Sequence, residues 1–178
     1  MTTSTQRPAG RRAQARFMRI VNVPMRAMLG LPFPTPLGSR LMLVHLTGRR
    51  SGHHYRQPVS YARHGDALLT PGGGNWKLNL VDGRPVRIRL RGRDITVRPE
   101  LVSGTDRIGS LLHVLVAQNP RAASFIRIPR DASGGFDRDA LEKAVHHGFR
   151  IVKWYPADEE SARVMQVPGE IQAERPGT

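Results

Sequence analysis

The sequence contains no cysteine, which excludes disulfide bonds, thiolate metal sites and cysteine nucleophiles. It has no apolar run of about 18 residues, so it predicts no membrane-spanning helix. The N-terminus is polar and rich in arginine and lacks the apolar stretch of a secretory signal, which favours a cytoplasmic protein. Aromatic residues make up only 6% of the chain and do not alternate with arginines, as a surface that stacks single-stranded nucleic acid would require.

Acidic residues are absent from the first third of the chain. The whole chain has 28 basic and 14 acidic residues and a formal net charge of +14. Residues 1–65 contain 11 arginines and no aspartate or glutamate, whereas the rest of the chain is nearly neutral. Arginine binds phosphate and carboxylate groups through two-point contacts. We therefore expect an anionic partner, which can be a small molecule, a membrane surface or a nucleic acid.

Short apolar or alternating stretches separated by glycine-containing turns predict mostly antiparallel strands. The clearest pattern is a hairpin of residues 86–90 and 94–98 joined by the turn at residues 91–93. Helices are predicted over residues 108–116 and 137–147, the second with an aspartate N-cap and a glycine at its end. Further predicted elements are strands at residues 41–47, 55–62 and 67–70 that form a meander, a short helix capped by Asn75, and a last strand at residues 150–155.

The 178 residues correspond to about one domain. Strands with a few short helices predict an α+β fold with a barrel-like, mostly antiparallel sheet. We expect residues 1–36 to form a basic helical lead, residues 37–156 the barrel domain, and residues 157–178 a loose tail. The apolar face of the lead and its arginines suit peripheral association with the anionic inner face of a membrane through residues 1–30.

The seven histidines and the scattered carboxylates form no zinc-binding or acid–base motif, and no phosphate-binding loop or nucleophile elbow is present. We therefore predict no metal site and assign no catalytic residue. Two glycine-containing segments remain. In residues 48–52 (GRRSG), two arginines and a serine lie between glycines, as in an anion-binding turn or a solvated hairpin turn. Residues 70–76 (TPGGGNW) lead from a strand into a helix, as in a loop that binds phosphate or ring oxygens, or in a flexible loop.

Taken in order, these segments resemble the deazaflavin-dependent nitroreductase family of coenzyme F-420-dependent oxidoreductases. The resemblance covers residues 37–97: a strand, GRRSG, a proline six residues after the second glycine, a Gly-Asp turn, a glycine-rich loop and W-x-x-N-L. It implies a split β-barrel of the FMN-binding type that binds coenzyme F-420, an 8-hydroxy-5-deazaflavin. The implied reaction is hydride transfer to an electron-poor acceptor such as a quinone, a nitro compound or an enone, in which the cofactor carries the chemistry.

The resemblance also implies which residues contact the coenzyme. The arginines and serine of GRRSG would hold its phosphate and glutamate tail, and residues 58–60 would lie near the ring. Residues 70–74 would offer backbone N–H groups to the ring edge, and the W-x-x-N-L helix would shape the site. The complete set is Arg49, Arg50, Ser51, Gly52, Arg56, Pro58, Val59, Ser60, Thr70, Pro71, Gly72, Gly73, Gly74, Trp76 and Asn79.

The chain departs from the family pattern at two places. Tyr55 stands where the family commonly has a basic residue, and the adjacent Arg56 points to the other face of a strand. In the glycine-rich loop, Pro71 and Gly72 stand where the family usually has serine followed by lysine or asparagine, and the loop is shorter before Trp76. Residues 120–148 match no segment of the family.

Two other readings remain open. The same fold could bind FMN, haem, or the coenzyme without turnover. The basic first third could instead bind a membrane surface or a nucleic acid, although no nucleic-acid reader motif is present and no nucleic acid is expected. The sequence is compatible with both a monomer and an oligomer.

Overall fold

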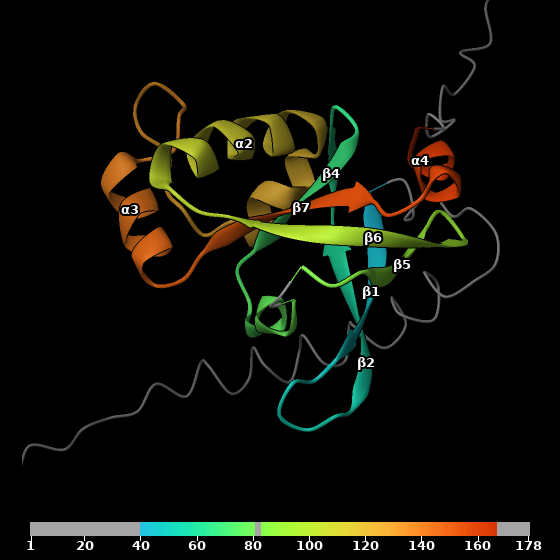
Figure 1. Ribbon diagram of the computed structural model, residues 1–178. Helices are drawn as coiled ribbons and strands as arrows, with labels where there is room; N and C mark the ends of the chain where they lie inside the picture. The colour runs from blue at the N-terminus through green and yellow to red at the C-terminus, as the bar shows by residue number, and fades with distance from the viewer. Residues whose placement is uncertain (1–39, 81–82, 167–178) are drawn as a thin grey trace, which may run out of the picture.

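The computed structural model describes residues 40–80 and 83–166. These residues form one curled, seven-stranded antiparallel sheet and the helices that pack on it (Figure 1). The strand order is β2-β1-β5-β6-β7-β4-β3. The fold is a split β-barrel with flanking helices, as predicted. Its strands are β1 (Leu41–Thr47), β2 (His54–Ser60), β3 (Ala62–His64), β4 (Ala67–Gly72), β5 (Val86–Leu90), β6 (Arg93–Val102) and β7 (Arg150–Pro156).

The β5–β6 hairpin forms as its alternating pattern predicts. Its two-residue turn has φ of 50° at Arg91 and 82° at Gly92, the left-handed pair that suits a tight hairpin. β6 continues to Val102 through Pro99, beyond the residue that pairs with the start of β5. One edge of β6 is unpaired there, and a proline without an N–H is tolerated at such an edge.

The predicted meander is wrong after β2. The expected single strand over residues 55–62 is interrupted at Tyr61, whose backbone N–H binds the carbonyl of Arg40 at 3.1 Å. β2 and β3 then lie at opposite edges of the sheet order. Alternation of apolar residues predicts that a strand is half-buried, but it does not specify the partner strand. Among the described strands, β2 and β3 are therefore the two edge strands of the sheet.

Apolar residues form two layers on the two faces of the sheet. One cluster fills the concave interior around Trp154, with Met42, Val44, Ile88 and Leu90. The other cluster packs the outer face of β4 and β7 under the helices, which lie together on that side (Figure 1). These helices are α2 (Thr105–Gln118), the 3-10 helix η2 (Pro120–Phe125) and α3 (Arg138–His146).

α3 begins and ends at the predicted signals. Asp137 accepts a hydrogen bond from the backbone N–H of Ala140 at 2.7 Å, as an N-cap does. Gly148 follows the helix with a φ of 89°, a conformation that glycine adopts without strain.

The loose tail expected from residue 157 is wrong for the segment that forms α4 (Glu159–Gln166). Asp158 caps this helix by accepting a hydrogen bond from the backbone N–H of Ser161 at 2.7 Å. Hydrogen bonds from the backbone and the side chain of Ser161 lower the pKa of the Asp158 carboxyl group. Val164 and Met165 pack into the interior cluster. Arg91 holds the end of the helix by donating to the carbonyl of Val164 at 2.6 Å.

The basic lead expected at residues 1–36 lies outside the described residues. Apart from the correction that α4 makes to the expected tail, the division of the chain into lead, domain and tail stays a prediction. Within residues 40–80 and 83–166, no helix is both long and apolar enough to cross a bilayer.

Candidate functional site

Asn79 joins the two glycine-containing segments that the sequence singles out. Its side-chain oxygen accepts from the backbone N–H of Arg49 at 2.9 Å. Its side-chain nitrogen donates to the hydroxyl of Tyr55 at 2.6 Å and to the carbonyl of Trp76 at 3.2 Å. One amide thus ties the β1–β2 turn to β2 and to the short helix η1 (Asn75–Asn79).

The GRRSG segment is a tight turn whose conformation favours glycine at Gly52, while a side chain at Gly48 would require Ser51 to change its rotamer. Gly52 has a φ of 68° and donates to the carbonyl of Gly48 at 2.7 Å. A Cβ at Gly48 would lie 2.6 Å from Oγ of Ser51. Arg49, Arg50 and Ser51 are all exposed at this turn, so their side chains can meet a ligand from solvent.

β2 separates Tyr55 from Arg56, as the strand alternation predicts. Tyr55 is half-buried against the interior cluster, whereas Arg56 is exposed and pairs in register with His45. Arg56 therefore does not occupy the face of Tyr55. Farther along β2, Pro58 is half-buried, and Val59 and Ser60 are buried.

The first residues of the predicted loop at 70–74 belong to β4 instead. Thr70, Pro71 and Gly72 pair in register with β7. Oγ1 of Thr70 accepts from Nε1 of Trp154 at 3.0 Å inside the barrel, so this side chain serves the core. β3 ends its pairing with β4 at Leu69, which leaves the other edge of residues 70–72 without that partner. Pro71 carries no N–H, so the donors of this segment come from its other residues.

The residues that follow, Gly74 to Asn79, form a compact segment that we call the wall of the site. Asn75 does not cap η1 as predicted; Gly74 is the N-cap, without a side-chain hydrogen bond. The Trp76 ring is parallel to that of Trp154, with an interplanar angle of 7° and centroids 6.2 Å apart. Lys77 is only 8% exposed and donates to the carbonyl of Gly74 at 2.8 Å. Burial lowers the pKa of the Lys77 ammonium, and Arg150 adds to the effect.

A cleft of about 550 Å³ lies beside this wall, between β1 and the start of β5. Several of its residues are basic, and none of the described lining residues is acidic. The lining comprises His45, Leu46, Thr47, Arg49, Leu78, Asn79, Leu80, Arg84, Pro85, Val86 and Arg87.

The structure brings Arg49, Trp76 and Asn79 of the predicted set into one hydrogen-bonded unit, with Tyr55 added to it. Arg50 and Ser51 lie at the same turn, but none of their described hydrogen bonds reaches this unit. The sequence did not single out His45, Lys77, Arg84 or Arg87. A histidine within the apolar run of β1 and a lysine within W-K-L-N-L were the available signals.

No group of three or more histidine, aspartate or glutamate side chains in the described part of the chain is arranged to hold a metal ion.

Solved structures with a similar architecture share little sequence with this chain. The FAD and heme binding protein from Mycobacterium smegmatis is 18% identical, with 74% of this chain and 75% of that chain covered and a TM-score of 0.42. A structure described as an F420 reductase is 15% identical, with 75% and 93% covered and a TM-score of 0.39. The F420-H2 dependent reductase FDR-A is 13% identical, with 65% and 93% covered and a TM-score of 0.43.

No curated protein matches the sequence. The sequence model of the F420H(2)-dependent quinone reductases, in contrast, matches residues 12–127. This match covers most of the chain and includes both glycine-containing segments and Asn79. The chain therefore belongs to the F420H(2)-dependent quinone reductase family.

Proposed function

We propose that this protein binds reduced coenzyme F420 and transfers its hydride to an electron-poor acceptor, with a quinone as the favoured class. Membership of the family supports the F420-dependent oxidoreductase activity. The observation that carries the site assignment is the hydrogen bonding of Asn79, which fixes the arginine-bearing turn against the helix beside the glycine-rich segment.

The residues present fit a flat ring that carries an anionic tail. The edge of β4 at residues 70–72 lacks β3 as a partner, and Gly73 is exposed, with only the Phe149 ring near its Cβ position. This surface leaves room for a ring close to the backbone. Arg49 and Arg50 lie at the exposed turn, where a guanidinium can bind a phosphate or a carboxylate.

When bound, the reduced deazaflavin supplies the hydride, and the protein supplies position and charge. We assign the anionic tail to Arg49, Arg50 and Ser51, the ring to the backbone of residues 72–74 and to residues 58–60, and the wall of the site to Trp76. The parallel packing of Trp76 on buried Trp154 holds that wall in place.

Tyr55 is suited to hold a proton in this site. Asn79 donates to its Oη, so the hydroxyl hydrogen of Tyr55 is free to donate elsewhere. Burial raises the pKa of Tyr55, with the Asn79 hydrogen bond opposing it, so the phenol is neutral at physiological pH. A neutral phenol can donate a hydrogen bond to an oxygen of the acceptor or the ring.

A spectroscopic titration tests the proposal. The apoprotein is titrated with oxidised F420 and with FMN, and reduced F420 is then mixed with a quinone, a nitroaromatic and an enone. We expect saturable F420 binding and fastest oxidation by the quinone. Tighter binding of FMN, or of haem, would favour the alternative that the fold serves another cofactor.

We also propose that residues 1–30 promote association with anionic membranes. The support is the run of arginines without acidic residues in this segment. Co-sedimentation with anionic vesicles at low salt, with and without these residues, is the test. Equal sedimentation of both forms would contradict the proposal.

A further inference from the structure

The cleft beside Asn79 lies where the hydrogen-bonded ladder between β1 and β5 ends. The two strands pair only at Leu43–Arg89 and Val44–Ile88, although β1 continues to Thr47. Beyond Val44 the two chain segments therefore form the walls of an open wedge. Leu78 and Asn79 of η1 also line this cleft.

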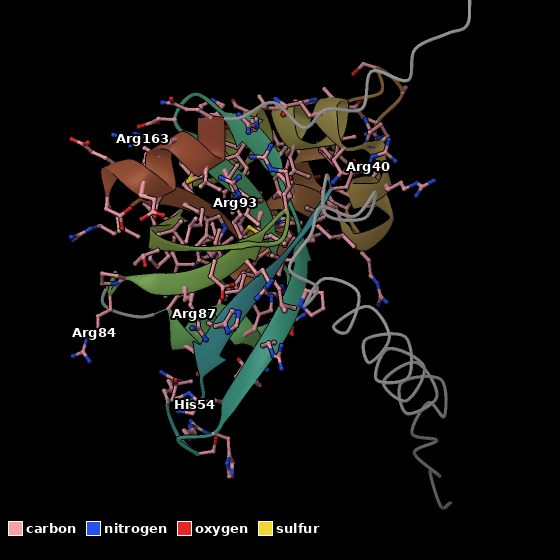
Figure 2. All side chains as sticks on the ribbon, turned by 90° about the vertical axis from the view of Figure 1, so that its right-hand side faces the viewer. Arg40, His54, Arg84, Arg87, Arg93 and Arg163 are labelled. Atoms are coloured by element: carbon pink, nitrogen blue, oxygen red, sulfur yellow. The ribbon has the colours of Figure 1, made fainter. Side chains whose placement is uncertain are left out.

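The wedge gathers positive charge from both walls. Arg49 comes from the β1 side, and Arg84 and Arg87 come from the β5 side. All three are exposed, and none forms an ion pair with a carboxylate among the described residues. In Figure 2 the side chain of Arg84 extends away from the barrel into solvent. Three arginines line one cleft and have no ion-pair partner among the described residues, so we expect an anionic ligand there.

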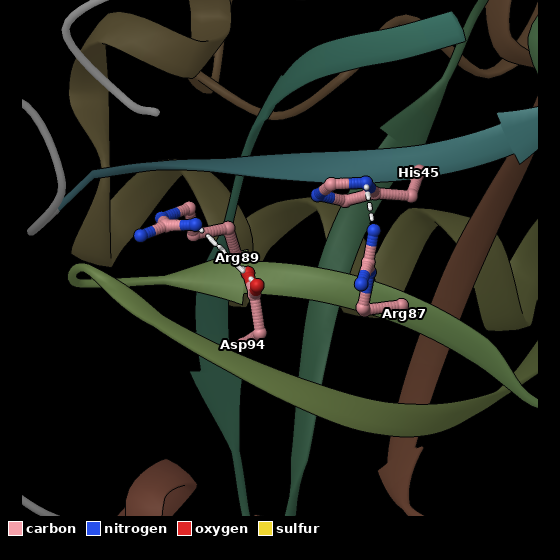
Figure 3. A network of polar contacts seen from close by, with 4 residues as sticks. All are labelled: His45, Arg87, Arg89 and Asp94. Carbon is pink, nitrogen blue, oxygen red and sulfur yellow. Dashed lines mark hydrogen bonds and ion pairs between the residues drawn. The ribbon is translucent and has the colours of Figure 1, made fainter. Parts of the chain in front are cut away.

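His45 adds a titratable group to the same cleft. Arg87 donates to Nδ1 of His45 at 3.3 Å, while the neighbouring Arg89 pairs with Asp94 at 3.3 Å (Figure 3). A guanidinium has no acceptor, so Nδ1 must accept and the proton of the neutral ring is on Nε2. Nε2 is buried and has no hydrogen-bond partner in the described part of the chain.

The surroundings of His45 hold its imidazole neutral. Burial lowers its pKa most, Arg87 on β5 adds to this, and Arg56 on β2 and Arg89 contribute further. Among the described residues, Asp94 on β6 acts in the opposite direction and raises the pKa. An anion placed beside Arg87 would offset these positive charges and favour the imidazolium form.

We propose that this cleft binds a carboxylate or phosphate group of a ligand and that its occupation is accompanied by proton uptake at His45. The anion has two possible sources: the tail of the coenzyme, because Arg49 and Asn79 are shared with the coenzyme site, or an acidic group on the hydride acceptor. The cleft and its charges carry the proposal; only the choice of source rests on the proposed function.

The first experiment uses apoprotein and a tail fragment, N-acetylated γ-linked diglutamate, in a calorimetric titration at about 0.15 M salt, where distant charges are screened. We expect saturable binding that Arg84→Ala with Arg87→Ala weakens about tenfold or more. Arg127→Ala removes an exposed arginine that does not line the cleft and is the matched control. A fragment that binds but loses no more affinity in the double variant than in this control would overturn the proposal.

The second experiment measures whether binding of the fragment is coupled to protonation of His45. The fragment keeps its charge between about pH 5.5 and pH 8, so a change of affinity reports the protein. We expect tighter binding at the lower pH and a rise in the pKa of His45, followed by NMR, when the fragment is added. His45→Gln, checked for folding by circular dichroism, should bind with little pH dependence. A wild-type affinity that does not change with pH would overturn the coupling.

The third experiment identifies the source. A naphthoquinone carboxylate and the uncharged naphthoquinone are each titrated into apoprotein and into the double variant. Binding of the diglutamate assigns the cleft to the coenzyme tail, and binding of the quinone carboxylate without the diglutamate assigns it to the acceptor. Binding of neither anion overturns the proposal. Since no arm needs F420, a failure of the proposed function would appear separately, as absent F420 binding with fragment binding retained.

Discussion

The side-chain oxygen of Asn79 accepts a hydrogen bond from the backbone N–H of Arg49 at 2.9 Å, which joins residues thirty positions apart in the sequence. Because this contact uses the backbone of Arg49, it fixes the turn while leaving the guanidinium available. The same amide holds Tyr55 and the carbonyl of Trp76. The geometry of the GRRSG turn and of the short helix that carries Trp76 therefore depends on one side chain.

Replacing Asn79 by alanine should loosen both parts of the site. Three hydrogen bonds are lost, and a net loss of about 1–3 kcal/mol in unfolding free energy is expected. F420 affinity should fall about tenfold or more, measured by fluorescence titration. Asn75→Ala, in the same helix and exposed, is the control and should change neither quantity. Unchanged F420 affinity in Asn79→Ala would show that the turn does not depend on this amide.

Two adjacent glycines of the proposed ring site, Gly72 and Gly73, should respond differently to replacement by alanine. A Cβ at Gly72 would lie 2.9 Å from the carbonyl oxygen of Arg150 and 3.2 Å from Cδ of Lys77. The backbone oxygen cannot move away easily, so Gly72→Ala should cost about 1–3 kcal/mol of stability. At Gly73 the nearest atoms are those of the Phe149 ring at 3.9 Å, an ordinary contact. Thermal unfolding of the two variants should therefore separate them, and equal melting temperatures would contradict this reading.

The buried hydrogen bond between Thr70 and Trp154 holds β4 and β7 together beneath the proposed ring site. Thr70→Val keeps the shape but leaves the indole N–H without its acceptor in the core, which should cost about 1–3 kcal/mol. Thr70→Ser retains the hydroxyl and should recover the indole hydrogen bond. Denaturant unfolding followed by tryptophan fluorescence measures both. A valine variant as stable as wild type would show that this bond contributes nothing.

The free energy of unfolding should decrease as the pH falls, and part of this decrease should come from His45. Burial lowers the folded-state pKa of His45 below its ordinary value of 6.5, so the unfolded chain binds the proton first as the pH falls. The contribution of neutral His45 is complete above about pH 6.5 and is lost as the pH falls through the folded-state pKa. Unfolding free energies at several pH values should show a smaller decrease for His45→Gln than for wild type. Parallel curves would contradict this role.

Local patterns predicted much of the fold. The bounds of β1 and β5, the hairpin and the cap of α3 follow from alternation, turn residues and an aspartate before a helix. The positions of β2 and β3 at opposite edges did not follow, because strand partners are set by the curl of the whole sheet. α4 was missed because its apolar face is short and gains its stability from contacts with the interior cluster.

The site was predictable where residues lie in one motif and not where the sheet brings distant residues together. The sequence motifs indicated Arg49 and Asn79, but the hydrogen bond between them is visible only in the fold. His45 and Arg87 meet between β1 and β5, and Arg84, from the segment before β5, lines the same cleft. Arg91 belongs to a turn that resembles a solvated hairpin in sequence, yet it binds the end of α4.

The most direct test of the account is the affinity of the apoprotein for F420 compared with FMN, measured together with two arginine variants at about 0.15 M salt. We predict that F420 binds more tightly than FMN, because the exposed arginines of the turn can contact a longer anionic tail. Arg50→Ala should weaken F420 binding about tenfold, and Arg127→Ala should leave it unchanged. FMN binding as tight as F420 binding, or equal losses in the two variants, would contradict a coenzyme site at this turn.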